Sequence, residues 1–307
     1  MTEEKSAASS DNQTLADRGN NRSRQPANSA FREFIGSNWG PRPENTQGRN
    51  ESAPWAAARR EDLGKLFPNK RLVIPAVPLK VRNNDCDYRF RPHSAFAHLT
   101  GTGTDFEPDA VLVLEPIRDG GQGPTHTAVL YFRPRASRSS EEFYGDPRYG
   151  ELWVGVRPSL EEVESATGMR CAHVDSLPDA LAKDAGPGAV QLRVVAEADE
   201  AYGSFLNYSP SIEIVTNVEP DHLDRYHSRE EFEQIFVEFA RRMVPGGLLV
   251  TCAEDEGAVR LAQSARAEGL RVVTYGRTER SLCTPDVVIA DVRVEAHGAG
   301  ASLTWGE

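Results

Sequence analysis

Cysteine is scarce in this sequence, with four residues among 307 and no C-x-x-C pair. This spacing argues against a zinc knuckle and against a disulfide framework, so we expect ordinary reduced thiols. No apolar run approaches the roughly 20 residues of a membrane-spanning helix, and the polar first residues lack the basic and apolar parts of a secretory signal. We therefore expect a cytosolic (cytoplasmic) protein with no membrane partner.

Positive charge is also in deficit. The chain has 46 Asp and Glu residues against 35 Lys and Arg residues, which gives a net charge of −11. A surface that follows phosphate backbones needs an excess of positive charge, so we expect no nucleic-acid partner. The hydrophobic fraction of 39% is sufficient to bury real cores, and the chain length corresponds to about two domains.

The first 67 residues carry few signals of a packed domain. Residues 1–28 are rich in Ser, Asn, Asp, Gln and Arg and almost free of large apolar residues, so we expect a disordered tail. Two helix-like segments follow, "SAFREFIGSNWG" (29–40) and "APWAAARREDLGKLFP" (53–68). The apolar stripe expected on the second segment consists of Trp55, Ala58, Leu63 and Leu66.

Residues 70–195 are expected to form a compact mixed α/β domain. Its strand signals are short apolar or β-branched runs bounded by Pro and Gly, namely "RLVIPA", "DAVLVLEP", "HTAVLYFRP" and "AVQLRVV". Ser159 and Glu162 form a capping box that predicts a helix ending near Gly168. "SLPDALAKD" predicts a further short helix before the last of these strands.

After residue 210 the pattern becomes a regular alternation of strands and helices. "SIEIVTNV" (211–218) predicts a buried strand, and Ser228 with Glu231 forms the capping box of the next helix. Strand "LLVTC", helix "EGAVRLAQSARAEG" and strand "LRVVTYG" follow, which predicts a parallel, doubly wound layer. The last 20 or so residues predict an antiparallel hairpin that turns at "HGAGA" (297–301). The apolar face of the capped helix holds Phe232, Ile235, Phe236, Phe239 and Met243.

The segment "NNDCDYRFRPHSAFAHLTGTGTDFEPDAVLVLEP" (83–116) resembles the amino-terminal domain of the aminopeptidase P (Xaa-Pro aminopeptidase) family. It follows that family's D-Y-x-F-R-x-x-S-x-F-x-x-L-T-G signature, and the resemblance extends over about residues 29–195. It implies a creatinase-type mixed sheet flanked by helices, which helps to assemble the oligomer and to wall the active site. In that family catalysis resembles two-metal hydrolysis, usually with manganese, and the metal ligands lie in a following pita-bread domain that has no counterpart in this sequence.

The residues inside this segment also have an interpretation that needs no family. Tyr88, Phe90, Phe96 and Leu99 are better explained as core and interface packing than as a substrate cage. His93 and His98 lie five apart in an expected strand and loop region, a poor spacing for two ligands on one face. We expect residues that lie at the surface or that support a site without binding the ligand. "TGTGTD" lacks the G-K-[ST] of a phosphate-binding loop and is expected to be a turn.

The second half, about residues 196–307, resembles the central, ATP-binding domain of the Mur ligase family, in its UDP-N-acetylmuramate:L-alanine ligase branch. That pattern is E-A-D-E-S-D-G-S-F followed by T-N-x-x-x-D-H-[LM]-D. The resemblance implies part of a parallel sheet, a magnesium ion held by Glu197 and His222, and a nucleotide contact at Asn217. Taken alone, the D-H-L-D string could simply cap a turn before Ser228. The positions that follow the pattern are Glu197, Asn217, Asp221, His222 and Asp224.

The sequence departs from the ligase pattern in two ways. Ala201 and Tyr202 stand where the family has Ser and Asp, which removes a hydroxyl and a carboxylate. The G-x-x-G-K-T-[ST] loop that would cradle ATP is not found in residues 100–195. Since the two resemblances meet at "VAEADE" (195–200), we interpret the chain as a hybrid. We expect its second part to keep about half of a parallel sheet and to leave a strand edge unpaired.

Two functions from different classes remain open at this point. The first is an aminopeptidase P-like module without its catalytic domain, which binds partners or forms a homo-oligomer through the amino-terminal domain and is not active alone. The alternative is a fragment of an ATP-dependent ligase of peptidoglycan synthesis that keeps weak magnesium or nucleotide contacts. No complete catalytic set is expected in either half.

Overall fold

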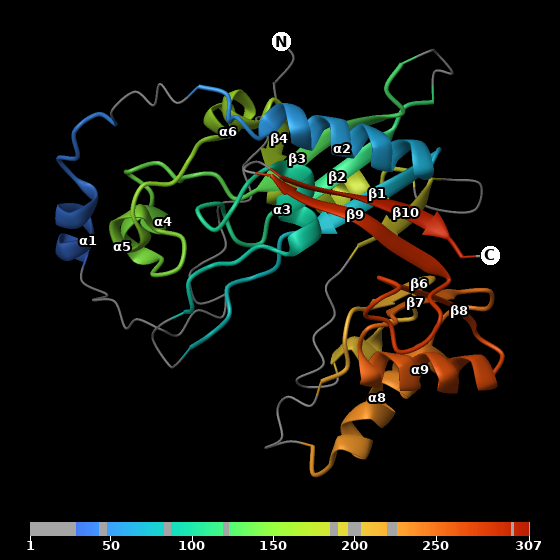
Figure 1. The fold of residues 1–307 in the computed structure, drawn as a ribbon. Helices are drawn as coiled ribbons and strands as arrows, with labels where there is room; N and C mark the ends of the chain where they lie inside the picture. The colour runs from blue at the N-terminus through green and yellow to red at the C-terminus, as the bar shows by residue number, and fades with distance from the viewer. Residues whose placement is uncertain are drawn as a thin grey trace. The chain divides into compact units, whose positions relative to one another are not determined.

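The structure, a computed structural model, covers most of the chain. It describes residues 29–42, 48–82, 87–118, 123–184, 190–195, 204–219, 226–295 and 298–306. The tail expected to be disordered (1–28) and most of the expected joint (195–200) lie outside these ranges. The chain divides into two compact units, with the boundary between residues 197 and 198. We call them unit 1 and unit 2 and describe each by itself (Figure 1).

Unit 1 is built on a five-stranded sheet in the order β4-β3-β2-β1-β5. The central strand β2 pairs antiparallel with β1 and β3, whereas β4 and β5 pair parallel with their neighbours at the two ends. The sheet is therefore mixed, and the fold class expected for this half is confirmed. The strands are β1 (Lys70–Pro75), β2 (Val111–Pro116), β3 (His126–Phe132), β4 (Arg170–His173) and β5 (Gln191–Val194).

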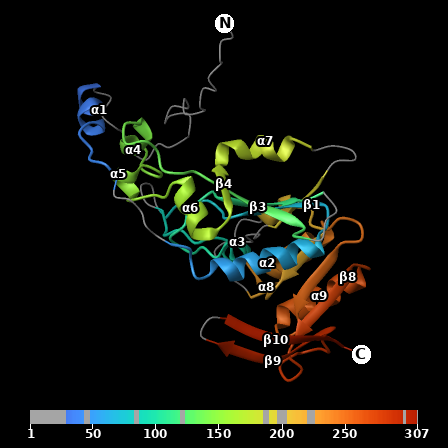
Figure 2. The same ribbon diagram turned by 90° about the horizontal axis from the view of Figure 1, so that it is seen from above.

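Helices cover both faces of this sheet. α7 packs on one face, where Val113 and Tyr131 contact its Leu177 and Leu181. α2, α3 and α6 cover the other face, and Figure 2 shows α7 and α2 on opposite sides of the strands. The helices are α1 (Ser29–Gly36), α2 (Ala53–Leu66), α3 (Ser94–Thr100), α4 (Glu141–Gly145), α5 (Glu151–Val154), α6 (Leu160–Thr167), the 3-10 turn η1 (Val174–Ser176) and α7 (Leu177–Ala182).

The capping box predicted for α6 is present. The Ser159 hydroxyl accepts from the backbone N–H of Glu162 at 3.3 Å, and the Glu162 carboxylate accepts from the backbone N–H of Ser159 at 2.8 Å. Gly168 ends the helix in the left-handed region, with φ of 69°, which glycine adopts without a Cβ clash. Local sequence signals therefore fix both ends of this helix.

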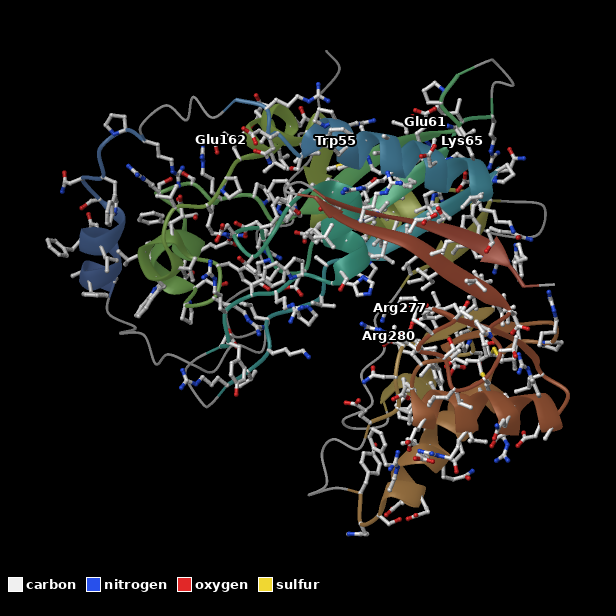
Figure 3. All side chains as sticks on the ribbon, in the orientation of Figure 1. Trp55, Glu61, Lys65, Glu162, Arg277 and Arg280 are labelled. Carbon is white, nitrogen blue, oxygen red and sulfur yellow. The ribbon has the colours of Figure 1, made fainter. Side chains whose placement is uncertain are left out.

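The apolar stripe predicted on α2 is wrong for three of its four residues: Leu63 packs against the core, but Trp55, Ala58 and Leu66 are exposed. Trp55 and Leu66 are 66% and 73% exposed, and Figure 3 labels Trp55 on this helix together with Glu61 and Lys65, which are also exposed. A Cβ on Gly64 would lie 2.6 Å from the His126 imidazole Nδ1, so this helix sits too close to the sheet for large side chains. The buried face instead consists of Ala53, Ala56, Arg60 and Gly64.

The predictions for the α3 region are partly corrected. Phe90, Phe96 and Leu99 are buried as expected, but Tyr88 is 57% exposed. His93 is only 7% exposed because it occupies the N-cap position of α3 against the core, not a surface strand or loop. His98 is exposed inside α3, and the "TGTGTD" segment begins at the end of that helix and turns.

Unit 2 is also built on a five-stranded sheet, in the order β10-β9-β8-β7-β6. β6, β7, β8 and β9 pair parallel, and β10 returns antiparallel to β9. The parallel layer and the final hairpin expected from the sequence are confirmed, and β6 has an open edge among the described strands. The expected double winding is wrong, because the strands follow one another in one direction and both described helices between them pack on the same face. The strands are β6 (Ile212–Val215), β7 (Leu248–Cys252), β8 (Arg271–Gly276), β9 (Val287–Glu295) and β10 (Gly298–Trp305).

One face of the parallel strands is covered by α8 (Arg229–Arg241) and α9 (Glu256–Ala267), which lie side by side under the sheet (Figure 1). A 3-10 turn, η2 (Ser204–Asn207), adds Phe205, whose ring lies 4.7 Å from that of Phe239 in α8. The core beneath the sheet joins both helices to β6, β7 and β8. No helix in the described ranges combines the length and hydropathy needed to cross a membrane.

Three local predictions in unit 2 need correction. β6 is not buried on both faces: Ile212 and Ile214 are 49% and 67% exposed, because α8 and α9 pack against the opposite face. The Ser228 hydroxyl accepts from the backbone N–H of Glu231 at 3.1 Å, as in a capping box. The Glu231 carboxylate, however, accepts from the backbone N–H of His227 and not from that of Ser228. The expected turn "HGAGA" belongs largely to β10, which already begins at Gly298.

Candidate functional site

The carboxyl ends of β6, β7 and β8 meet at one edge of the unit 2 sheet, where ligands bind in parallel α/β folds. Three loops leave this edge, at Thr216–Glu219, Ala253–Asp255 and from Arg277. We call these loops the carboxyl edge. It is the candidate site because Asn217 and His222, two of the residues predicted to bind ligands, follow β6 in the sequence, whereas Glu197 follows β5 of the other sheet.

Asp255 holds two of these loops together. One oxygen of its carboxylate, Oδ1, accepts from the backbone N–H of Ala258 at 2.7 Å, which caps the first turn of α9. The same oxygen accepts from the backbone N–H of Val218 at 2.9 Å, which ties the loop after β6 to that helix. The position of the β6 loop therefore depends on a single carboxylate in the next loop.

Gly257 allows this close approach. A Cβ at this position would lie 2.3 Å from the carbonyl oxygen of Val218, a distance that real Cβ atoms do not reach. α9 can therefore begin directly against the β6 loop only because residue 257 has no side chain.

The loop after β8 contributes a charge pair. The guanidinium of Arg277 donates to the two carboxylate oxygens of Glu254 at 3.0 and 2.7 Å, and the backbone N–H of Arg277 adds a third bond at 2.8 Å. These hydrogen bonds lower the pKa of Glu254 to about 2. Figure 3 labels Arg277 and Arg280 near each other in unit 2. The Arg277 charge is thus already neutralised by its own neighbour.

The structure tests only part of the site predicted from sequence. Asn217 is exposed at the carboxyl edge, where its Oδ1 accepts from the hydroxyl of Thr216 at 3.1 Å. Glu197 and His222 lie outside the described residues, as do Asp221, Asp224, Ala201 and Tyr202. The expected magnesium pair and the nucleotide contact remain predictions.

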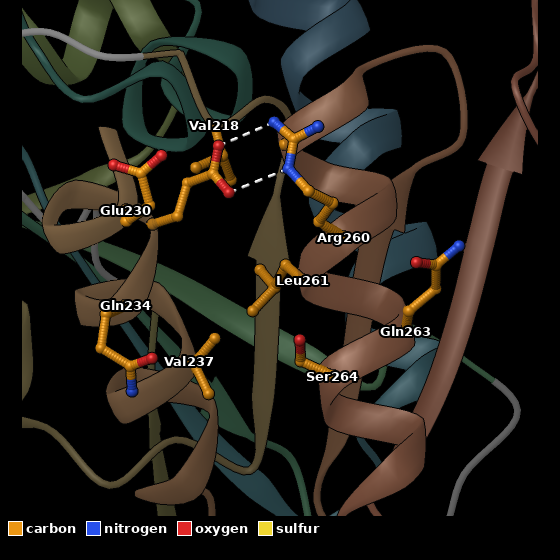
Figure 4. A pocket seen from close by; sticks show the side chains of 10 residues that line it. Val218, Glu230, Gln234, Val237, Arg260, Leu261, Gln263 and Ser264 are labelled. Atoms are coloured by element: carbon orange, nitrogen blue, oxygen red, sulfur yellow. Dashed lines mark hydrogen bonds and ion pairs between the residues drawn. The ribbon is translucent and has the colours of Figure 1, made fainter. Parts of the chain in front are cut away.

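A hollow of about 270 Å³ lies between α8 and α9 and reaches Val218 and Gly257 of the carboxyl edge (Figure 4). Arg260 of α9 donates to the two oxygens of Glu233 of α8 at 2.9 and 2.7 Å, as the dashed lines show. This contact lowers the pKa of Glu233. The charges of Arg260 and Glu233 therefore pair with each other within the protein. The remaining polar lining is uncharged apart from Glu230.

The described residues do not fit a paired-manganese centre. Such a centre needs several carboxylates and a His converging on one pocket. Within the described ranges, no group of three or more His, Cys, Asp or Glu side chains could hold a metal ion. For magnesium, the expected ligands lie outside those ranges, so Asn217 is the one predicted contact that the structure places.

Sequence reasoning missed Glu254, Asp255 and Arg277. A signal existed for Asp255, because it directly precedes the predicted helix "EGAVRLAQSARAEG" and Asp is a preferred N-cap residue. Nothing in the sequence pairs Glu254 with Arg277, which are 23 residues apart and meet only because β7 and β8 are neighbours.

The comparisons with known proteins divide the chain near the same place. Residues 56–191 match the family model of the aminopeptidase P, N-terminal domain, and residues 194–305 match that of the Mur ligase middle domain. The two parts of the chain are similar to segments of two different families. Both resemblances seen in the sequence are thereby confirmed, and the two matches meet within β5. Unit 1 is the aminopeptidase P-like unit and unit 2 the Mur ligase-like unit.

The curated relatives fall into the same two groups. Xaa-Pro aminopeptidase 2 of Streptomyces coelicolor is 44% identical over 151 residues, which cover 49% of this chain and 30% of that protein. UDP-N-acetylmuramate–L-alanine ligase of Kineococcus radiotolerans is 52% identical over 112 residues, which cover 36% of this chain and 23% of that protein. The chain thus spans less than a third of the length of either relative.

Solved structures match the aminopeptidase P-like unit. Aminopeptidase PepP of Pseudomonas aeruginosa is 27% identical, with a TM-score of 0.37, covering 49% of this chain and 30% of that chain. The low-pH form of Escherichia coli aminopeptidase P is 26% identical, with a TM-score of 0.35, covering 43% of this chain and 26% of that chain.

Proposed function

We propose that the chain is a noncatalytic binding module, in which the aminopeptidase P-like unit docks onto peptidase subunits and does not itself cut peptides. The proposal rests on five glutamates of this unit, each of which forms an ion pair with an arginine and is therefore poorly placed to bind a metal ion. Peptide hydrolysis at two metal ions needs carboxylates free to coordinate them. The pairs are Glu107 with Arg157, Glu115 with Arg71, Glu142 with Arg133, Glu151 with Arg42 and Glu162 with Arg135.

An exposed apolar surface supports the binding role. Phe34 of α1 is 75% exposed, Trp153 of α5 is 53% exposed and Val156 beside it is 89% exposed. α1 packs against α4, and α4 packs against α5, so these residues belong to one lobe of the unit. Trp39 anchors the lobe through an edge-to-face contact with Phe143 at 4.9 Å between ring centroids. Clustered large apolar side chains of this kind are typical of protein interfaces.

The catalytic side of the proposal is tested by assay. The purified chain is incubated with manganese and a Xaa-Pro peptide, beside a full-length Xaa-Pro aminopeptidase as the positive control. We expect no cleavage above the buffer rate. Cleavage by this chain that chelation abolishes would contradict the noncatalytic role.

The binding side is tested with the same full-length aminopeptidase by analytical ultracentrifugation. We expect association that is lost in a Phe34→Ser, Trp153→Ser double variant. Trp55→Ser is the matched control, because Trp55 is equally exposed but lies on α2. If the double variant and the control bind equally, this surface is not the interface.

A second candidate function is a ligase fragment that binds magnesium and ATP. It is favoured by the 52% identity to UDP-N-acetylmuramate–L-alanine ligase and by the exposure of Asn217 at the carboxyl edge. Glu197 and His222 would hold the metal ion, which would bridge phosphate oxygens. Equilibrium binding of ATP with magnesium to the wild type and to His222→Ala decides the matter, since equal and negligible binding would end this idea.

A cytosolic location belongs to the same proposal. It is supported by the free thiols of Cys171, Cys252 and Cys283, which suit a reducing compartment. The experiment is fractionation of the producing cell, and recovery of the chain outside the cytosol would contradict it.

A further inference from the structure

Two strands of this chain have open edges. β5 is the last strand of its sheet and pairs with β1, and β6 is the last strand of the other sheet and pairs with β7. The backbone groups on the outer side of each strand have no ladder partner among the described strands. Such an edge can accept another strand by backbone hydrogen bonding.

The hydrogen bonds of β5 show which residues face outward. The N–H of Val195 donates to the carbonyl of Val73 in β1 at 2.9 Å. Because backbone groups of successive strand residues point to alternate sides, Arg193 also faces β1, whereas Leu192 and Val194 present their N–H and C=O groups to the open side.

The same reasoning applies to β6. The N–H of Leu248 in β7 donates to the carbonyl of Ser211 at 3.1 Å, so residues 211, 213 and 215 face β7. Ile212 and Ile214 therefore present their backbone groups to the open side. Each edge offers two residues, spaced two apart, for a new ladder.

These two edges fit each other as an antiparallel pair. The outward residues meet as hydrogen-bonded pairs when Leu192 lies opposite Ile214 and Val194 lies opposite Ile212. All four side chains then lie on one face, and all four are now exposed, by 39%, 67%, 64% and 49% respectively. Cross-strand pairs of aliphatic side chains of this kind stabilise a sheet.

The same register places Arg193 directly opposite Glu213. These two residues form the non-hydrogen-bonded pair, in which side chains approach most closely. A parallel pairing of the same edges would set Arg193 beside Ile212 or Ile214 instead. Charge complementarity therefore selects the antiparallel arrangement.

Glu213 lacks a partner in the described structure. Its side chain is buried, with 3% exposure for the residue, and neither carboxylate oxygen has a hydrogen-bond partner among the described residues. A buried carboxyl group without a partner is costly, and an opposite charge removes most of that cost. Arg193 is partly exposed on its own strand, from which it can reach across the new junction.

We propose that β5 of one copy of this chain pairs antiparallel with β6 of a second copy, with Arg193 opposite Glu213. Each copy carries both edges, so a pair of copies related by a two-fold axis would contain two identical junctions. Pairing within one chain would need a hairpin loop of residues 196–210, far longer than the usual two to five residues. That segment also contains Phe205, which packs against Phe236 and Phe239 of α8.

Cysteine cross-linking between differently marked chains tests this interface. One chain carries Val194→Cys and a mass tag, and the other carries Ile212→Cys. Opposed strand residues about 5.5 Å apart at Cα are within reach of a disulfide. We expect mild oxidation of the mixture to give a dimer whose disulfide joins positions 194 and 212, identified by peptide mass so that native cysteines are not counted.

The control mixes the Val194→Cys chain with a Leu303→Cys chain. Leu303 is 67% exposed on β10, at the far end of the same sheet from β6. We expect much less cross-linking there. Equal yields in the two mixtures would overturn the proposal. A third sample is a chain that carries both Val194→Cys and Ile212→Cys. If its 194–212 disulfide forms only within one chain and never between two chains, the proposal is also overturned.

A charge series tests the register. Arg193→Glu sets two carboxyl groups opposite each other, and we expect it to weaken dimerisation about 2- to 30-fold over two junctions, whereas Arg193→Lys changes it little. Adding Glu213→Gln to Arg193→Glu is expected to restore part of the loss. Glu213→Gln is measured both with Arg193 and with Arg193→Glu. If it changes dimerisation equally in the two backgrounds, the side chains at 193 and 213 do not face each other and the proposed register is wrong.

Discussion

The guanidinium of Arg157 donates twice to one carboxylate oxygen of Glu107, from Nε at 2.9 Å and from Nη2 at 2.5 Å, and both residues are buried. Arg157 also donates to the backbone carbonyls of Tyr149 and Arg133 at 2.7 Å each. One arginine thereby joins three segments of the aminopeptidase P-like unit. Burial raises the pKa of Glu107 even though Arg157 lies beside it.

Arg157→Ala should destabilise this unit by about 3–5 kcal/mol, because it leaves a buried carboxyl group without its partner. Urea unfolding followed by circular dichroism measures the change. Arg89→Ala is the matched control: its ion pair with Asp105 is fully at the surface and should contribute less than about 1 kcal/mol. A loss for Arg157→Ala no larger than the control would show that the buried network is not a stabilising feature.

Gly257→Ala should destabilise the Mur ligase-like unit by about 1–3 kcal/mol, because the new methyl group would overlap the Val218 carbonyl. In a helix with free space at this position, Gly→Ala would instead stabilise the protein by up to about 1 kcal/mol. A loss of stability in Gly257→Ala would therefore show that the Val218 carbonyl obstructs the new methyl group. Gly300→Ala, where a Cβ meets nothing within 4 Å, serves as the control in the same unit. Thermal unfolding reports both.

The pKa of Glu254 should rise from about 2 toward its ordinary 4.5 in Arg277→Ala, because the mutation removes the guanidinium hydrogen bonds. A carboxyl-detected NMR titration measures this directly. Arg280→Ala should produce a smaller rise, since Arg280 acts on Glu254 through charge alone. Equal shifts in the two variants would contradict the assignment of the hydrogen bonds as the main cause.

Glu213 should make the Mur ligase-like unit less stable as pH rises. Burial raises the pKa of Glu213 from 4.5 to about 8 in the folded state, so the folded chain holds a proton that the unfolded chain releases. The free energy of unfolding therefore falls as pH increases from about 4.5 to about 8. Glu213→Gln should remove this slope and stabilise the unit at pH 8 by on the order of 2–4 kcal/mol.

The measurement is chemical unfolding at several pH values and at low protein concentration, where the proposed strand pairing is not populated. Glu219→Gln is the control, because Glu219 is exposed just beyond the same strand. If the pH slope is unchanged in Glu213→Gln, another group causes it.

Much of the fold could be predicted because its signals are local. The Ser159 and Glu162 capping box, the left-handed Gly168 and the apolar face of α8 each depend on residues within a few positions of one another. The parallel pairing of β6, β7 and β8 could also be predicted, because strands that alternate with helices pair in parallel. Family resemblance added the identity of the two segments, which periodicity alone does not give.

The errors arose where an element's surroundings decide the outcome. Trp55 and Leu66 of α2 are exposed, whereas the helix approaches the sheet at Gly64, where a Cβ would not fit. β6 reads as an apolar strand, yet its two isoleucines are exposed and Glu213 points into the core. A strand's sequence gives its alternation but not which of its faces a helix will cover.

The sequence by itself determined that two α/β segments, each similar to a different family, meet near residue 195. It also determined where most helices and strands begin and end, because caps, turns and periodicity act over a few residues. Only the tertiary structure decided that Asp255 ties the β6 loop to α9, that Glu254 meets Arg277, and which strands, β5 and β6, carry the open edges. These relationships join residues far apart in the chain. They form only when the strands have paired and the helices have packed against one face of the sheet.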